Sequence, residues 1–305
     1  MKKIGDVLPL VPKSQSKVKK EASALSKRQG QVIHLAGKLA EKSREEADEL
    51  GFMSRLLLMV NLPYREPDPS LRNWHRMNGN ISIDIVSAYK DGQPIGLPYG
   101  AYPRLILAYL VTQAVKTQSP IIYLGKSFSQ FIAFLGMKRG GKQYKQLQMQ
   151  LKRTLSASFA WTYETDKRWS RTNIQVSHQS HLWWDEKDTQ DSSSWESYIK
   201  LNTDFFNEII RHAVPLDLRV LSLLKNSPLG LDLYMFLSWR VFNLQKPVYI
   251  SWQSLQQQLG GQYADLKVFS RDCRMHITRL QVLHPELNID FLKGRLCLKP
   301  SFYQN

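Results

Sequence analysis

The sequence contains a diverged internal repeat, and this feature limits the possible folds more than any other. In each copy a serine precedes apolar residues at helical spacing, and a glycine follows, which predicts a short amphipathic helix with an N-cap and a C-terminal stop. Two copies of one helical module are therefore expected. Ser127, Phe128, Phe131, Leu135 and Gly136 match Ser251, Trp252, Leu255, Leu259 and Gly260 at a constant offset of 124.

The same order of elements surrounds both short helices. A buried helix and a short strand precede each one, and a longer helix and a hairpin follow it. This is the order of a winged helix, the helix-turn-helix variant with a β-hairpin beside the recognition helix. We therefore expect an α+β, mostly helical fold with two winged-helix domains in tandem. The first set covers 102–116, 120–124, 127–136, 142–156, 159–163 and 173–177, and the second 228–243, 248–250, 251–260, 266–283, 288–292 and 295–299.

The longer helix of the first copy follows Gly140 and Gly141 and contains no Asp or Glu. Tyr144, Leu147, Leu151 and Leu155 share one face, which predicts packing. The opposite face gathers cationic and amide side chains, which suit phosphates and base edges in a major groove. A solvated basic face on an ordinary surface helix is the alternative. The occurrence of a second such helix favours nucleic-acid binding.

Helical phase selects the candidate DNA contacts. For base edges these are Gln146, Gln150 and Arg153 in the first helix and Arg271, Arg274 and Thr278 in the second. For the DNA backbone they are Lys142, Lys145, Lys152, Lys167, Arg168 and Arg171. Lys138, Arg139, Gln143 and Lys267 complete the predicted interface.

Composition agrees with a polyanionic partner. The chain has 305 residues, a formal net charge of +16 and a pI near 9.7, which favour nucleic acid over a membrane surface. Its apolar runs are far shorter than the roughly 18 residues that span a bilayer, and we expect no signal peptide. The two cysteines, Cys273 and Cys297, are too few for a disulfide framework. A reducing cytoplasmic location is therefore expected.

Changes in composition suggest domain boundaries. The predicted division is a basic disordered arm at 1–42, a first domain at 43–184, an acidic linker at 185–197 and a second domain at 198–305. Ser43 is expected to start a helix that ends near Leu62, because acidic residues follow it. The alternating strand Ile81–Val86 is the expected dimer surface.

Signs of catalysis are weak. His178 and His181 lack further ligands nearby, so no metal site is expected, and no cofactor is expected either. The His-apolar-His motif of a DNA-nicking enzyme is absent, and Gly140–Lys142 lacks the spacing of a phosphate loop. Cys273 has an inward phase that indicates packing. We therefore predict that the chain is not an enzyme.

Several long segments resemble the plasmid-encoded RepA-type replication initiator proteins. These segments are GLPYGAYPRLILAYLVTQAV at 96–115, SFSQFIAFLG at 127–136, VPLDLRVLSLLKNSPLGLDLYMFLSWR at 214–240 and ISWQSLQQQLG at 250–260. The resemblance covers residues 71 to 303 and implies tandem winged helices that bind short direct repeats, called iterons, in double-stranded origin DNA.

The resemblance also implies partners and a bacterial cytoplasmic location, associated with the nucleoid or plasmid. Such proteins open AT-rich DNA with the help of a host initiator, bring in the replicative helicase, and exist as a homodimer in equilibrium with a monomer. The dimer binds the promoter of its own gene and represses it. Two alternatives remain open: a dedicated transcriptional repressor with tandem winged helices, and a DNA-nicking relaxase or nuclease.

Overall fold

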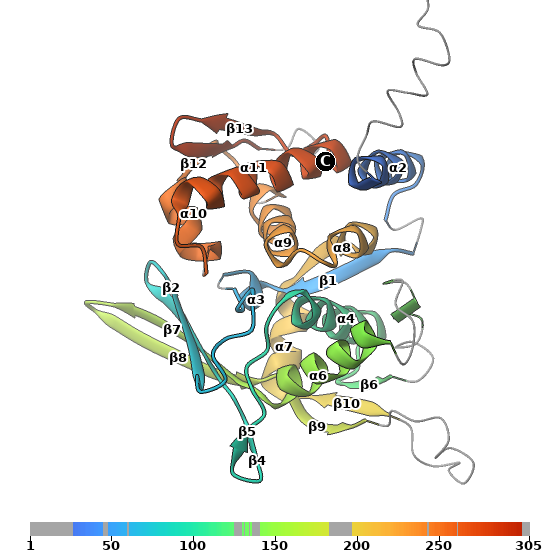
Figure 1. Ribbon diagram of the computed structural model, residues 1–305, viewed down its shortest axis with the longest axis vertical. Coiled ribbons are helices and arrows are strands. Elements are labelled where there is room, and N and C mark those ends of the chain that lie inside the picture. The colour runs from blue at the N-terminus through green and yellow to red at the C-terminus, as the bar shows by residue number, and fades with distance from the viewer. Residues whose placement is uncertain are drawn as a thin grey trace, which may run out of the picture.

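A computed structural model describes residues 27–44, 48–59, 61–124, 130, 132, 133, 135, 141–182, 197–242, 244–260 and 262–300. The described residues form both helices and strands, as Figure 1 shows, which confirms the predicted mixture of the two. Among the described residues, no helix is both long enough and apolar enough to cross a bilayer.

Two long helices, one from each repeat, form the centre of the molecule. They are α4 (Ala101–Thr117) and α9 (Pro228–Phe242), which lie at the predicted positions and contact each other. Both are buried along most of their length, as expected for helices that are apolar on nearly every side. The sequence interpretation missed one polar contact between them, an ion pair of Arg104 with Asp232.

The ion pair is bidentate and lies in the core. The Arg104 Nε donates to Asp232 Oδ1 at 2.6 Å, and the Arg104 Nη2 donates to Asp232 Oδ2 at 2.8 Å. The same guanidinium donates to the carbonyl oxygens of Leu62 at 2.8 Å and Gly100 at 2.6 Å. Only 2% of the Arg104 side chain and 8% of the Asp232 side chain are exposed. Burial of two charges costs little only when partners satisfy them, and here the two charged groups and the nearby backbone carbonyls do so.

A four-stranded antiparallel sheet carries the first predicted hairpin. Its strand order is β2-β3-β7-β8, so the hairpin β7–β8 extends a sheet begun much earlier in the chain. Strand β3 is central because β2 and β7 pair with both of its edges, and Ile83 and Ile85 are fully buried. The expectation of an exposed dimer strand at Ile81–Val86 is therefore wrong. The strands are β2 (Asn73–Asn78), β3 (Ile81–Val86), β7 (Ser158–Thr165) and β8 (Arg168–Gln175).

Two further sheets join parts of the chain that are far apart in sequence. Strand β10, which directly follows the predicted linker, pairs with β6 and β9, and β11 pairs with β1. The segment after residue 197 thus begins by packing against the first half of the chain. The proposed domain division stays a prediction. These strands are β1 (Leu50–Ser54), β6 (Ile121–Tyr123), β9 (Ser177–His181), β10 (Tyr198–Leu201) and β11 (Ala213–Asp217).

The N-terminal part differs from its sequence interpretation. Residues 27–41, assigned to the disordered arm, form helix α2 (Lys27–Glu41), which packs against α8 (Leu218–Leu224) and α11 (Leu266–Leu283). The helix expected from Ser43 to Leu62 is replaced by β1 and the short helix α3 (Arg55–Met59). The remaining elements of the first part are β4 (Tyr89–Lys90), β5 (Gln93–Pro94) and α7 (Thr203–His212).

The second repeat follows its predicted order closely. After α9 come β12 (Val248–Ser251), α10 (Trp252–Leu259), α11, β13 (Ile289–Leu292) and β14 (Arg295–Leu298). The Ser251 hydroxyl accepts a hydrogen bond from the Ser254 backbone N–H at 3.0 Å, which confirms the predicted N-cap. Strands β12, β14 and β13 form one antiparallel sheet beside α10 and α11.

The two repeats differ in strand partners. In the second repeat, β12 pairs with its own hairpin, whereas in the first, β6 pairs with β10 and the hairpin pairs with β3. Whether each half is a winged helix stays a prediction. Most of the predicted first short helix, including Ser127 and Gly136, lies outside the described residues.

The end of α10 connects the two halves. The Asn61 side chain donates to the Leu259 carbonyl at 2.7 Å, and the Tyr64 hydroxyl donates to the same oxygen. The Gln262 side chain accepts the backbone N–H groups of Tyr64 at 2.9 Å and Arg65 at 2.7 Å. Asn61 and Tyr64 thus satisfy a carbonyl that an α-helix leaves unpaired at its C-terminus.

Candidate nucleic-acid interface

Helix α6 (Lys142–Ser156) lies where the sequence predicts the first basic helix. It begins after Gly141, and Leu147, Leu151 and Leu155 are buried against the core that includes α4. Most of the predicted polar contacts stay accessible. Exposed side chains on this helix are Lys142, Gln143, Lys145 and Lys152, and the helix has no acidic residue to offset them.

Two of the predicted base contacts point into the protein instead. Gln150 is fully buried, and its amide oxygen accepts the Tyr99 backbone N–H at 2.9 Å. Arg153 is 14% exposed, and its guanidinium lies 5.3 Å from the centre of the Tyr99 ring. It donates to the Ile95 carbonyl at 3.2 Å and forms an ion pair with Glu66 at 3.1 Å. We therefore leave Gln150 and Arg153 out of the interface.

These two side chains explain the GLPYG segment that precedes α4. Gly96 has a φ of +99°, and a Cβ there would lie 2.8 Å from the Arg153 guanidinium, so only glycine fits easily. The third predicted base contact, Gln146, is half-buried. The pKa of the neighbouring Tyr99 hydroxyl is raised, mainly by burial, although a hydrogen bond to Gln146 acts in the opposite direction. Gln146 remains near the exposed face of α6.

The hairpin β7–β8 carries the predicted cationic turn. Lys167 lies in the turn, and Arg168 begins β8. Arg171 is engaged by the sheet, because its Nη1 lies 3.2 Å from Asp84 Oδ2 and 3.0 Å from Thr162 Oγ1. Lys167 and Arg168 are therefore the better candidates for phosphate contacts. Lys138 and Arg139 lie outside the described residues.

Helix α11 presents the second predicted set. Its N-cap is Asp265, whose carboxylate accepts the backbone N–H groups of Lys267 at 2.6 Å and Val268 at 3.2 Å. Lys267 and Arg271 are exposed, although Arg271 also pairs with Asp272 at 3.0 Å. Thr278 is exposed and faces a groove of about 620 Å³ beside α2. Lys267, Arg271 and Thr278 are thus exposed, and Arg274 is partly exposed.

Arg274 is held by aromatic rings. Its guanidinium carbon lies 4.8 Å from the centre of the Trp252 ring and 4.9 Å from that of Phe291. The two rings are nearly parallel, at 18° and 6.4 Å between centres. Such cation–π contacts fix the orientation of an arginine while leaving its N–H donors able to bind a partner. Arg274 therefore connects α10, α11 and the hairpin β13–β14.

The sequence interpretation missed a cation on the second hairpin. The Arg295 guanidinium carbon lies 4.7 Å from the centre of the exposed Tyr249 ring, beside the turn at Gly294. Its position next to a glycine turn in a basic chain is the signal that could have identified it. Arg295 and Lys293 add exposed positive charge to the hairpin that follows α11.

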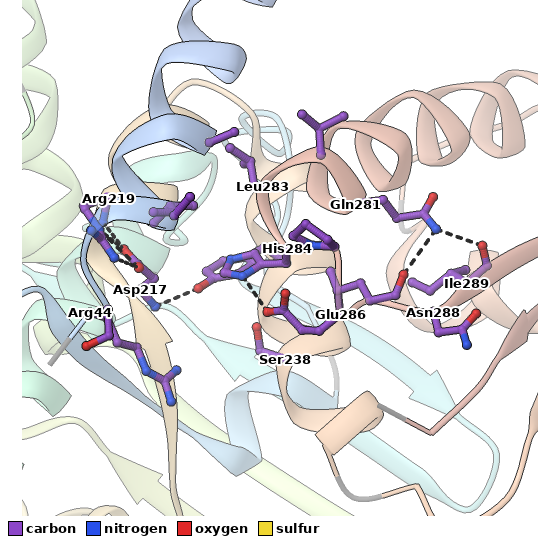
Figure 2. A pocket seen from close by; sticks show the side chains of 18 of the residues that line it. Arg44, Asp217, Arg219, Ser238, Gln281, Leu283, His284, Glu286, Asn288 and Ile289 are labelled. Atoms are coloured by element: carbon purple, nitrogen blue, oxygen red, sulfur yellow. Dashed lines mark hydrogen bonds and ion pairs between the residues drawn. The ribbon is translucent and has the colours of Figure 1, made fainter. Parts of the chain in front are cut away.

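A cleft of about 850 Å³ lies elsewhere, between α2, α9 and the residues that follow α11 (Figure 2). The Tyr234 and His284 rings stack at 5.8 Å, and the His284 Nδ1 lies 2.9 Å from Glu286 Oε1. Burial alone would raise the pKa of Glu286, but hydrogen bonds to His284 and to the backbone hold it below its usual value. The charged groups of the cleft are thus largely satisfied by one another.

One ion pair in this cleft fastens α2. Asp217 and Arg219 pair at 2.6 Å, and Arg219 also donates to the Lys42 carbonyl at 3.1 Å, just past the end of α2. The Asp217 backbone N–H donates to the Tyr234 hydroxyl at 2.7 Å. Burial raises the pKa of Tyr234, so this hydroxyl stays neutral and cannot serve as a base. The cleft is consistent with a structural junction.

The histidine and cysteine side chains considered for metal binding or catalysis have ordinary surroundings. His181 stacks on Tyr198 at 4.9 Å and lies 3.0 Å from the Gln179 amide. Burial raises the pKa of the Cys273 thiol, so the thiolate that nucleophilic catalysis requires is disfavoured. Within the described ranges, no three His, Cys, Asp or Glu side chains are grouped so that they could hold a metal ion.

Comparison with known proteins places this geometry in a family. No curated protein matches the chain. A crystal structure of domains 2 and 3 of RctB superposes with a TM-score of 0.51 at 13% identity, covering 81% of this chain and 96% of that one. A second crystal structure of these two domains gives 0.47 at 14% identity, with 80% and 96% covered. The first likeness supports the fold alone.

The match by sequence is more specific. Residues 97–254, more than half of the chain, match the family described as plasmid encoded RepA protein. This range contains α4, α6, the hairpin β7–β8 and α9, and it overlaps each of the four segments on which the sequence resemblance rests. The resemblance is thereby confirmed, and the chain belongs to the family of plasmid-encoded RepA proteins.

Proposed function

We propose that this protein initiates plasmid replication by binding direct repeats in the double-stranded DNA of its plasmid origin. The observation that carries the proposal is α6, an exposed basic helix without acidic residues, inside the range that matches the RepA family. Lys142, Lys145 and Lys152 recur along it at steps of three and seven residues, so they line one side of the helix. Such a row suits the phosphates beside a major groove.

A second basic helix supports sequence-specific binding. Lys267, Arg271 and Arg274 share one side of α11, and the hairpin that follows adds Lys293 and Arg295. Two such helices could enter successive major grooves, about 34 Å apart along the duplex. A monomer would then bind a long site without a palindrome, as expected for a direct repeat.

Further steps in the proposal follow from the family. The bound protein would open the adjacent AT-rich DNA with the help of a host initiator and bring in the replicative helicase. A homodimer in equilibrium with the monomer would bind the promoter and repress the gene. Such a protein would act in the bacterial cytoplasm, associated with the plasmid.

Nuclease footprinting with the full chain tests the proposal. The probe is the DNA that flanks the gene, at two salt concentrations, because phosphate contacts make binding salt-dependent. We expect protection of several spaced repeats in the same direction, each about two helical turns long. Absence of specific protection at both salt concentrations would contradict the proposal.

The same experiment separates two other functions. Protection of a single palindrome at the promoter, together with failure to support replication of an origin plasmid, would favour a dedicated repressor. Strand cleavage that depends on an added divalent metal would favour a DNA-nicking enzyme.

A further inference from the structure

The hairpin β7–β8 exposes a tryptophan that the core does not use. Trp169 is 63% exposed, and no hydrogen bond of its side chain, ion pair or ring contact connects the indole to the described part of the chain. By contrast, Trp74, Trp161 and Trp252 are buried or packed against the core. An exposed indole is expensive to leave in water and is a common contact residue in binding sites.

The position of Trp169 makes it accessible to a large partner. It is the second residue of β8, which is an edge strand, and its cross-strand neighbour is Glu164. The pairing of β3 with β7 ends at Ile81 and Tyr163, so the last part of the hairpin extends beyond the end of β3. Figure 1 shows this hairpin projecting from the side of the molecule.

The charges at this tip are balanced. Glu164 and Asp166 accompany Lys167 and Arg168, and the two cations form no ion pair within the described residues. The tip therefore provides no excess of positive charge, unlike α6. Its distinctive chemical feature is the open face of one indole ring.

We propose that Trp169 stacks on an unpaired base, so that the hairpin tip is a contact site for single-stranded DNA. In duplex DNA, neighbouring base pairs cover the base faces, and the apolar wedges that enter it are usually narrower side chains. Proteins that bind single strands instead use aromatic rings as stacking platforms. This inference rests on the proposed function, because origin opening would supply the unpaired bases next to the bound duplex.

Four versions of the full chain test the proposal: the wild type, Trp169→Ala, Trp169→Phe and Met77→Ala. Met77 is the matched control, since it is 62% exposed on the opposite edge strand of the same sheet. The probe is a labelled oligothymidylate of about 16 nucleotides. We expect Trp169→Ala to weaken binding by about 5- to 150-fold, Trp169→Phe to weaken it much less, and Met77→Ala to leave it unchanged.

Two further readouts distinguish stacking from charge and from misfolding. The salt dependence of oligothymidylate binding should be equal in the wild type and Trp169→Ala, because no cation is removed. Oligothymidylate should quench more tryptophan fluorescence in the wild type than in Trp169→Phe. Footprints on duplex DNA and urea unfolding curves should be unchanged in Trp169→Ala.

Specific results would overturn the inference. The first is a wild type that does not bind oligothymidylate. The second is equal affinity in Trp169→Ala and the wild type. The third is an equal loss of affinity in Trp169→Phe and Trp169→Ala. A parallel loss of duplex binding in Trp169→Ala would also overturn it. Failure of the proposed function is a separate result, namely a wild type without specific duplex protection.

Discussion

The two long basic helices occupy matching places in the repeat but use their arginines differently. In α6, Arg153 turns inward to the 95–97 backbone, and the exposed charge comes from lysines. In α11, Arg274 lies on the rings of Trp252 and Phe291 at the surface beside its hairpin. Under the proposed function, we therefore expect α6 to contribute mainly phosphate contacts and α11 to offer an oriented arginine to a base edge.

The sheets of the two repeats also differ. The hairpin after α11 closes onto β12 of its own repeat, whereas the hairpin after α6 joins β3. The sheet of the second repeat is thus formed by its own strands, whereas the first repeat depends on strands supplied from elsewhere in the chain. Variants of each half can test how far this contrast extends.

The largest effect is expected at the ion pair that joins the two central helices. Arg104→Met leaves the buried Asp232 carboxylate without its partner, so we expect the free energy of unfolding to fall by about 3 to 5 kcal/mol. Urea denaturation measures this. The double variant Arg104→Met with Asp232→Leu should recover part of the loss, and an unchanged or greater loss would contradict the ion-pair explanation.

Alanine substitutions at two glycines, one in each half, compare the halves directly. A Cβ at Gly96 would meet both positive φ strain and the Arg153 guanidinium, so Gly96→Ala should cost about 2 to 5 kcal/mol of unfolding free energy. Gly294 has a φ of +75° but no atom within 4 Å of an added Cβ. Gly294→Ala should therefore cost only about 1 to 2 kcal/mol. Equal losses in denaturation experiments would disprove the close contact with Arg153.

Arg274 tests the assignment of base reading to α11. Arg274→Ala should cost about 1 to 3 kcal/mol of binding free energy and relax the preference at one position of the site. Competition among single-position variants of the footprinted site measures that preference. A uniform loss on every sequence would make Arg274 a phosphate contact and remove the contrast with α6.

Tyr263 gives an effect that is limited to alkaline pH. Burial raises the pKa of this hydroxyl, which lies 3.2 Å from Asp272 Oδ2, from 10.0 to about 12. Between these values it ionises only in the unfolded chain, so its contribution to the free energy of unfolding is present below pH 10 and lost as the pH rises.

The matching experiment follows unfolding by urea from pH 9 to pH 12 in wild type and Tyr263→Phe, with Tyr249→Phe on the exposed ring as control. The difference in free energy of unfolding between wild type and Tyr263→Phe should change with pH. The corresponding difference for Tyr249→Phe should change less. A difference that is independent of pH in Tyr263→Phe would contradict the role of burial.

Helical periodicity predicted much of the fold. The bounds of α4, α6, α9, α10 and α11 follow from apolar spacing, caps and glycine stops, which act within a few residues. The hairpins were predicted for the same reason. The strand β1 was not, because its pairing with β11 depends on residues more than 150 positions later. Helix α2 was also missed, because its stability comes from packing against α11 rather than from a strong local pattern.

The candidate site shows the same limit. Lys142 and Lys145 are exposed as helical phase predicts, but phase placed Arg153 on the outer face, and its long side chain bends back to the 95–97 carbonyls. Gln150 is buried because it supplies the acceptor for Tyr99. Both depend on a loop that precedes α4, and no local pattern reveals such a partner.

The most direct test of DNA binding by α6 is the salt dependence of affinity for the footprinted duplex. The variant Lys142→Gln, Lys145→Gln, Lys152→Gln is compared with a matched variant of three exposed lysines elsewhere, Lys90→Gln, Lys200→Gln and Lys246→Gln. If each α6 lysine neutralises one phosphate, the slope of log K against log salt should become shallower by about 2.7 in the first variant and stay unchanged in the second. Equal slopes in the two variants would contradict the account.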